Sequence, residues 1–140
     1  MIAYLDTSVV VPILINEPTS GTCRELWRTA DRPVSTRLLY IETVSAIEQA
    51  RMMKRITESG ATAAEQTLGS MWPDVSIIEL DQQLMMNAAV MARRFGLRGY
   101  DSVHCAAALQ INDRDFLAAT ADQTLSQAWS ELGLTVFNPE

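Results

Sequence analysis

This sequence of 140 residues is poor in cysteine and lacks both long apolar runs and targeting signals. Its two cysteines, Cys23 and Cys105, are far apart and show no metal-ligand spacing, which excludes a disulfide framework and a cysteine-based zinc site. No run approaches the roughly 18 apolar residues of a membrane span. The N-terminus has no basic segment, and Asp6 interrupts its apolar stretch, which argues against a signal peptide. We therefore expect a cytoplasmic protein with reduced thiols.

Basic residues and phosphate-binding glycine motifs are also scarce. The 11 basic residues against 17 acidic ones give a net charge of −6, which argues against a broad basic surface for nucleic acid. Neither GxGxxG nor GxxxxGK[ST] occurs, so the usual phosphate cradle of nucleotide cofactors is missing. An acidic pocket can still handle phosphates when it binds a divalent cation, because the cation reverses the local charge.

The length fits one domain, residues 1–140, and the hydrophobic content of 48% is ordinary for a globular protein. Short apolar segments alternate with longer segments of helical periodicity. Strands are predicted at Ile2–Leu5, Pro33–Ser35, Val75–Leu80, Phe116–Thr120 and Leu134–Phe137. Helices are predicted at Ser8–Asn16, Ser20–Ala30, Thr36 to about Ile56, Thr62–Met71, Asp81–Gly96, from Tyr100 or Asp101 onward, and Asp122–Gly133. This alternation predicts an α/β fold with a parallel sheet covered on both faces.

Four acids stand out from this pattern because each has apolar neighbours and a hydroxyl residue close by. Asp6 ends the first strand in "AYLDTSVVV", and Asp122 follows the fourth. Glu42 lies in "LLYIETVSAI", and Asp101 lies in "LRGYDSVHCAAAL". Sites in such sheets form beyond the carboxyl ends of the strands. Four carboxylates meeting there would repel one another, and a hard divalent ion such as Mg²⁺ or Mn²⁺ would relieve that repulsion.

Each acid also has a simpler structural interpretation. Asp6, Asp101 and Asp122 could each cap the helix that follows, and Glu42 could be an exposed helix residue. Capping does not compete with metal binding, since one carboxylate oxygen can serve each purpose.

The four motifs together resemble a known family. "YLDTSVVV", "YIETVSAI", "LRGYDSVHCAAAL" and "FLAATADQTL" resemble the PIN-domain ribonucleases, and their spacing is most similar to that of the VapC toxins of bacterial toxin–antitoxin pairs. The resemblance covers essentially the whole chain. It implies a PIN-like α/β/α sandwich with a five-stranded, mostly parallel central sheet, and a Mg²⁺- or Mn²⁺-dependent endoribonuclease. Metal-activated water, rather than an RNA 2′-hydroxyl, would attack and leave a 5′-phosphate.

Position by position, the resemblance assigns the catalytic acids as Asp6, Glu42, Asp101 and Asp122. Asp6 and Asp101 would be the main metal ligands and Asp122 a more variable one, while Glu42 would bind a second metal or orient the attacking water. Ser8 and Thr120 would support the site. The resemblance also implies a homodimer and a cognate VapB-like antitoxin that covers the active site.

Three basic side chains near the Asp101 motif have more than one interpretation. Arg98 and Arg94 are candidate contacts for the RNA backbone, or solvated charges at a helix end. His104, the only histidine, lies one helical turn after Asp101 and could act as a base. We favour a partly buried helix residue for His104, since a histidine base is not required.

Rival functions fit the motifs less well. A haloacid dehalogenase-type enzyme needs a second Asp two residues after the first, where this chain has Ser8. A receiver domain needs a Lys near the end of the sheet, but the only lysine is Lys54. A housekeeping RNA-processing PIN nuclease and a non-catalytic PIN-like interaction module stay open, although the presence of all four acids counts against the second.

Overall fold

A parallel sheet of five strands forms the centre of the protein, and the computed structural model describes all 140 residues. The strands are β1 (Ile2–Leu5), β2 (Arg32–Thr36), β3 (Ser76–Ile78), β4 (Phe116–Ala119) and β5 (Val136–Phe137). Their order across the sheet is β3-β2-β1-β4-β5, and every neighbouring pair is parallel. The predicted fold class is confirmed, with β1 at the centre.

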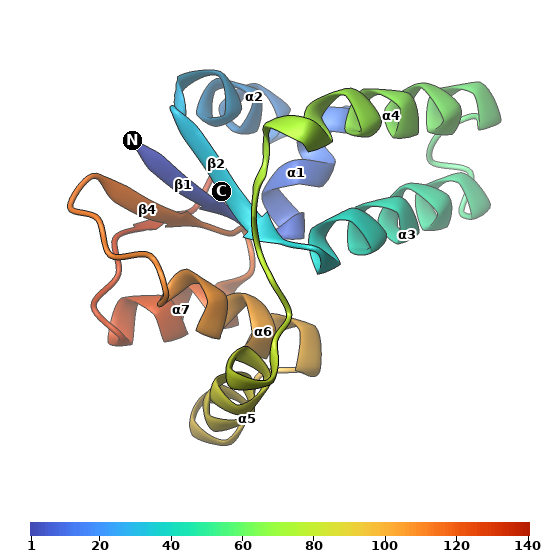
Figure 1. Cartoon of the computed structure of the whole chain (residues 1–140). Helices are drawn as coiled ribbons and strands as arrows, with labels where there is room; N and C mark the ends of the chain where they lie inside the picture. The colour runs from blue at the N-terminus through green and yellow to red at the C-terminus, as the bar shows by residue number, and fades with distance from the viewer.

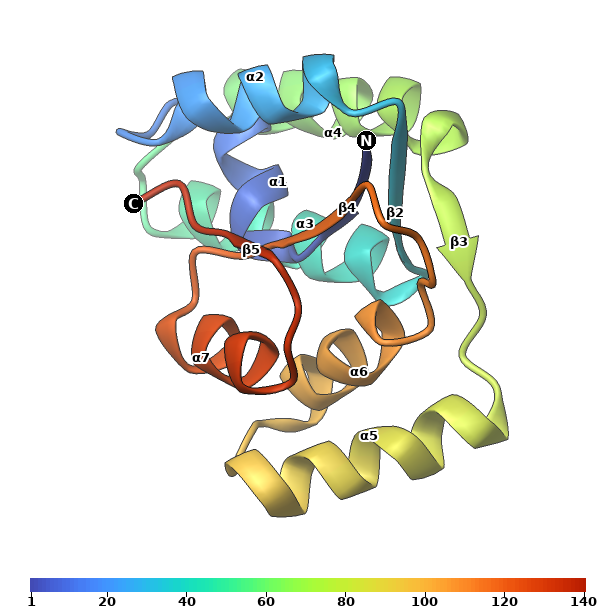
Figure 2. The ribbon, with the colours of Figure 1, turned by 90° about the vertical axis from the view of Figure 1, so that its left-hand side faces the viewer.

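Helices cover both faces of this sheet, as Figures 1 and 2 show. One layer holds α1 to α4 and the other holds α5 to α7 (Figure 2). Their bounds are α1 (Thr7–Leu14), α2 (Ser20–Thr29), α3 (Leu38–Met52), α4 (Glu58–Met71), α5 (Gln82–Phe95), α6 (Gly99–Ala108) and α7 (Gln123–Glu131), with a short 3₁₀ turn at Trp72–Asp74. None of these helices is both long enough and apolar enough to cross a membrane.

The core lies on both faces of the sheet because successive strand residues face opposite sides. Tyr4 belongs to a cluster with Leu125 and Trp129 under α5 to α7. Its neighbours Ala3 and Leu5 belong to a second cluster with residues of α1, α2 and α3. Asp6 continues the strand direction and leaves the core at the carboxyl edge of the sheet.

Several predicted boundaries were wrong. Helix α4 begins at Glu58, not Thr62, because Thr57 accepts a cap bond from the amide of Gly60 at 3.0 Å, so Gly60 lies inside the helix and does not precede it. The strands predicted at Val75–Leu80 and Leu134–Phe137 are shorter, since β3 and β5 form the sheet edges and have a neighbour on one side only.

Two predicted helix ends also differ, and a third agrees. Helix α3 ends at Met52, before a turn that puts Lys54 at a positive φ of 60°. Helix α1 ends at Leu14, two residues after Pro12, whose nitrogen has no hydrogen for the helical ladder. Helix α5 ends as predicted, with Gly96 in the left-handed conformation at φ 67°.

Candidate active site

All four predicted acids line one cavity at the carboxyl edge of the sheet. Its volume is about 560 Å³. The strand order changes direction at β1, because β2 lies on one side of β1 and β4 lies on the other. Open parallel sheets form their binding sites at such a switch point. The lining residues are Asp6, Thr7, Ser8, Val11, Glu42, Ala46, Arg98, Gly99, Tyr100, Asp101 and Asp122.

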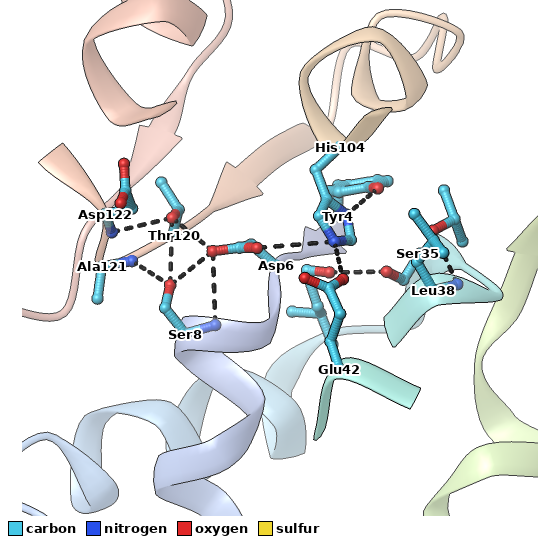
Figure 3. A network of polar contacts seen from close by, with 12 residues as sticks. Tyr4, Asp6, Ser8, Ser35, Leu38, Glu42, His104, Thr120, Ala121 and Asp122 are labelled. Atoms are coloured by element: carbon cyan, nitrogen blue, oxygen red, sulfur yellow. Dashed lines mark hydrogen bonds and ion pairs between the residues drawn. The ribbon is translucent and has the colours of Figure 1, made fainter. Parts of the chain in front are cut away.

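Asp6 is held by hydroxyl groups from two elements (Figure 3). Its Oδ2 accepts hydrogen bonds from Ser8 Oγ at 2.7 Å and from Thr120 Oγ1 at 2.8 Å, and a longer one from the Ser8 amide at 3.4 Å. The side chain is almost fully buried. The Asp6 carboxylate therefore caps α1, as one interpretation predicted, while Oδ1 is left outside this hydroxyl cluster.

The two hydroxyl groups are themselves fixed by backbone amides. The amide of Ala121 donates to Ser8 Oγ at 2.8 Å, and the amide of Asp122 donates to Thr120 Oγ1 at 3.0 Å. An amide can only donate, so each hydroxyl accepts there and has its own proton for Asp6. Ser8 and Thr120 thus both contact Asp6 directly, and their supporting role in the site stays a prediction.

Asp122 caps helix α7 and lines the cavity as well. Its Oδ1 accepts from the amide of Leu125 at 2.8 Å. One carboxylate oxygen of Asp122 thus caps the helix, and the other is available to bind a metal ion, so capping and metal binding do not compete.

Asp101 does not cap helix α6, so the interpretation of Asp101 as a helix cap was wrong. Arg98 holds the capping position of α6 without a side-chain bond, and Asp101 lies in the first turn. Partial burial raises the pKa of the Asp101 carboxyl above its ordinary value of 3.8. The negative charges of Asp6 and Asp122 raise it further, while His104 and Arg98 oppose this in part. The carboxylates thus repel one another in the absence of a cation.

Glu42 is not an exposed helix residue, since 15% of its side chain is accessible. Its Oε1 lies 2.6 Å from His104 Nε2, and His104 Nδ1 lies 2.6 Å from the hydroxyl of Tyr4. His104 and Tyr4 are both completely buried, so the expectation of a partly buried His104 understated its burial. His104 contacts Glu42 more closely than it contacts Asp6, whose Oδ1 is 3.8 Å away.

The environment shifts the pKa of His104, which contacts Glu42, and of Tyr4, which contacts His104. Burial lowers the pKa of the His104 imidazole, but the hydrogen bond to Glu42 and the charges of Asp6, Glu42 and Asp101 outweigh this and raise it overall. Burial raises the pKa of the Tyr4 phenol well above its usual value, although the Ser35 and Thr36 hydroxyls oppose that shift.

The two arginine candidates differ in position. Arg98 lines the cavity beside Tyr100, whose side chain is 60% exposed. Arg94 is not a lining residue, and its guanidinium lies 4.8 Å from the ring centroid of Phe95. The cavity mouth therefore combines one cation and one exposed aromatic ring with the four acids.

The donor set fits a hard divalent cation in its chemistry. Carboxylate oxygens are the ligands that Mg²⁺ and Mn²⁺ prefer, and the raised pKa of Asp101 reflects negative charges that a cation would offset. As the side chains stand, no three His, Cys, Asp or Glu residues are arranged to hold one ion. Sharing an ion therefore requires side-chain rotation.

Two members of the site were missed from the sequence. Tyr4 forms a hydrogen bond with His104, which contacts Glu42, and Tyr100 lines the cavity mouth. A phenol in a predicted buried strand needs a hydrogen-bond partner, and that requirement could have linked Tyr4 to the single histidine. For Tyr100 the sequence contains no comparable indication.

Known proteins agree with this architecture. The PIN domain family model matches residues 3–128. "Ribonuclease VapC45" of Mycobacterium tuberculosis is 33% identical over 124 residues, which cover 89% of this chain and 86% of that protein. Two solved structures share the fold with TM-scores of 0.68. One is a toxin-antitoxin complex from Klebsiella pneumoniae (12% identity, 100% and 98% of the two chains), and the other is Mycobacterium tuberculosis VapC20, a toxin that cleaves the sarcin-ricin loop (17% identity, 96% and 97%).

Proposed function

The chain belongs to the PIN-domain family, and we propose that it is a VapC-type endoribonuclease, the toxin of a toxin–antitoxin pair. The observation that carries the proposal is the cavity in which Asp6, Glu42, Asp101 and Asp122 meet at the carboxyl edge of the sheet. A relative named as a VapC ribonuclease, similar over most of both chains, supports it. A non-catalytic interaction module would have no need for four acids in one cavity.

Asp6, Asp101 and Asp122 are the residues that would hold Mg²⁺ or Mn²⁺. When bound, the cation would lower the pKa of a coordinated water and offset the charge of the phosphate in transit. Asp6 is the most firmly oriented of the three, because two hydroxyl groups and a backbone amide fix its Oδ2. Asp101 carries the raised pKa that a nearby cation would return toward its ordinary value.

The chain's own residues divide the remaining tasks. Glu42 orients the attacking water and accepts its proton. Water attacks the phosphorus, the bond to the 3′-oxygen breaks, and that oxygen takes up a proton from solvent, so the products carry a 5′-phosphate and a 3′-hydroxyl. Arg98 contacts a backbone phosphate, and the exposed ring of Tyr100 offers a stacking surface for a base at the cavity mouth.

An acidic cavity of this kind also suits a protein inhibitor. An arginine side chain of a VapB-like antitoxin would pair with the carboxylates and compete with the cation. The toxin–antitoxin complex with the same fold is consistent with such a partner. We propose a homodimer as the functional form, in keeping with the family.

Mapping of RNA ends after brief expression tests the proposal. Expression of the wild-type chain should produce new 5′-phosphate ends at a small number of RNA sites within minutes of induction, and Asp6→Asn should produce none. Equal patterns of RNA ends for the two chains would refute the nuclease assignment. Protein levels and circular dichroism spectra of the two chains serve as controls.

A further inference from the structure

We propose that Tyr4 and His104 are positioning residues that hold the Glu42 carboxylate through one tautomer of the imidazole, with the proton on Nε2. The task of Glu42 in catalysis rests on the proposed function, whereas the tautomer can be tested without it. Neither Tyr4 nor His104 lines the cavity, so both act through Glu42 and not on the substrate.

The network runs through three elements that are far apart in the sequence. Tyr4 belongs to β1, His104 to α6 and Glu42 to α3, and Figure 3 shows the imidazole between the phenol and the carboxylate. Both hydrogen bonds measure 2.6 Å between heavy atoms. Because Tyr4 and His104 have no accessible surface, water does not compete for these bonds.

The chemistry of the partners sets the direction of each bond. A phenol has an ordinary pKa of about 10 and is protonated near neutral pH, so the Tyr4 hydroxyl has a proton to donate to Nδ1, 2.6 Å away. A neutral imidazole carries one proton, and an ionised carboxylate only accepts. With Nδ1 accepting from Tyr4, the imidazole proton is on Nε2 and points at Glu42 Oε1. The other tautomer would place a nitrogen lone pair 2.6 Å from a carboxylate oxygen, which is repulsive.

Packing keeps the ring where this arrangement requires it. The Tyr4 ring meets the imidazole edge to face, with centroids 5.7 Å apart, and meets Trp129 in the same way at 5.8 Å. Glu42 Oε1 is therefore bonded to the buried imidazole, whereas Oε2 accepts no hydrogen bond from the protein. The network thus leaves one oxygen of Glu42 available to a water in the cavity.

Nitrogen-15 NMR of the imidazole tests the tautomer directly, because His104 is the only histidine of the chain. We expect metal-free wild-type protein without a purification tag, at a pH high enough that the imidazole resonances no longer change with pH, to show a protonated Nε2 and an unprotonated Nδ1. Tyr4→Phe should leave the proton on Nε2, because Glu42 still accepts it, but should shift the Nδ1 resonance, because that nitrogen loses its hydrogen-bond donor. Tyr40→Phe, which removes a phenol on the outer side of α3, is the matched control and should leave the spectrum unchanged.

Variants of His104 separate positioning from simple packing. His104→Leu removes the donor, and we expect it to lower the rate of cleavage at the mapped RNA site by roughly 10- to 100-fold, as the loss of supporting partners does in other sites. His104→Gln keeps an N–H near the place of Nε2 and should recover most of that loss, although its melting temperature should not exceed that of His104→Leu.

The outcomes distinguish this proposal from the nuclease assignment. A proton on Nδ1 of the neutral imidazole, or an unchanged spectrum in Tyr4→Phe, would overturn the network as described. Equal cleavage rates for His104→Leu and His104→Gln at equal stability would overturn the positioning role. If the wild-type chain cleaves no RNA while the spectrum is as expected, the proposed function fails and the network survives.

Discussion

Thr120 Oγ1 donates a hydrogen bond to Asp6 Oδ2 at 2.8 Å, although 114 positions of sequence separate the two residues. Thr120 follows the last residue of β4, and Asp6 follows the last residue of β1. The pairing of these two central strands brings them together. The orientation of the most deeply buried acid of the cavity therefore depends on the register of the sheet.

Replacing Thr120 with Val should weaken both stability and metal binding. The change keeps the shape of the side chain but removes the donor to Asp6 and the acceptor for the Asp122 amide. We expect a loss of about 1–3 kcal/mol in the free energy of unfolding and a roughly 10-fold or greater loss of Mn²⁺ affinity. Chemical denaturation and isothermal titration with Mn²⁺ measure the two effects.

Thr120→Ser is the matched control because it keeps the hydroxyl. Its Mn²⁺ affinity should stay close to that of the wild type. If the Val and Ser variants bound Mn²⁺ equally well, the hydroxyl would have no part in orienting Asp6.

Asp101→Asn should change the pH dependence of stability in EDTA. The folded protein holds the Asp101 proton more tightly than the unfolded chain does, because its pKa is raised from 3.8. Ionisation of Asp101 therefore costs stability, so the wild type loses this contribution as the pH rises from 3.8 through the raised pKa. We expect the melting temperature of Asp101→Asn, relative to that of the wild type, to increase between about pH 4 and pH 7.

Mg²⁺ should make the wild type melt at a higher temperature than Asp101→Asn near pH 7, because a bound cation offsets the repulsion that raises the pKa of Asp101. Asp74→Asn, in an exposed turn, is the control and should follow the wild type at every pH. If the melting temperatures of Asp101→Asn and the wild type in EDTA differed by the same amount at every pH from about 4 to 7, the carboxylates would not repel one another in the folded protein.

Arg98→Gln should raise the KM for RNA several-fold with little change in melting temperature. Arg98 is exposed and lines the cavity, so its loss would remove the proposed phosphate contact and not a core interaction. The slope of log affinity against log salt should fall by about 0.7 for one contact to single-stranded RNA. Arg114→Gln, at the amino end of β4, is the control. Equal salt slopes for both variants would remove Arg98 from the RNA-binding surface.

The sequence predicted the fold class and the meeting of four acids at one sheet edge, because both predictions depend on local patterns. Apolar segments such as Ile2–Leu5 reveal buried strands, and an acid at the end of such a segment is conspicuous. Element ends were less predictable, since they depend on partners from elsewhere. The start of α4 depends on a single cap bond to Thr57, and the lengths of β3 and β5 depend on their edge positions.

Local sequence patterns did not reveal which side chains form hydrogen bonds with one another in the site. Asp101 and His104 are one helical turn apart, which allows the two to approach each other, but His104 bonds to Glu42 on α3. Helical spacing describes neighbours on one helix, whereas tertiary packing decides which side chain an imidazole meets. The link from Tyr4 to His104 spans 100 positions and leaves no trace in local periodicity.

The rate of RNA cleavage by the purified chain, freed of any partner and measured with Mg²⁺ or Mn²⁺ and then with EDTA, tests the central claim most directly. We predict cleavage that yields 5′-phosphate ends with either ion, stops in EDTA, and falls by at least about 100-fold in both Asp6→Asn and Asp101→Asn. Cleavage that continued in EDTA, or that proceeded at the wild-type rate in either variant, would contradict a metal-dependent nuclease site built on these carboxylates.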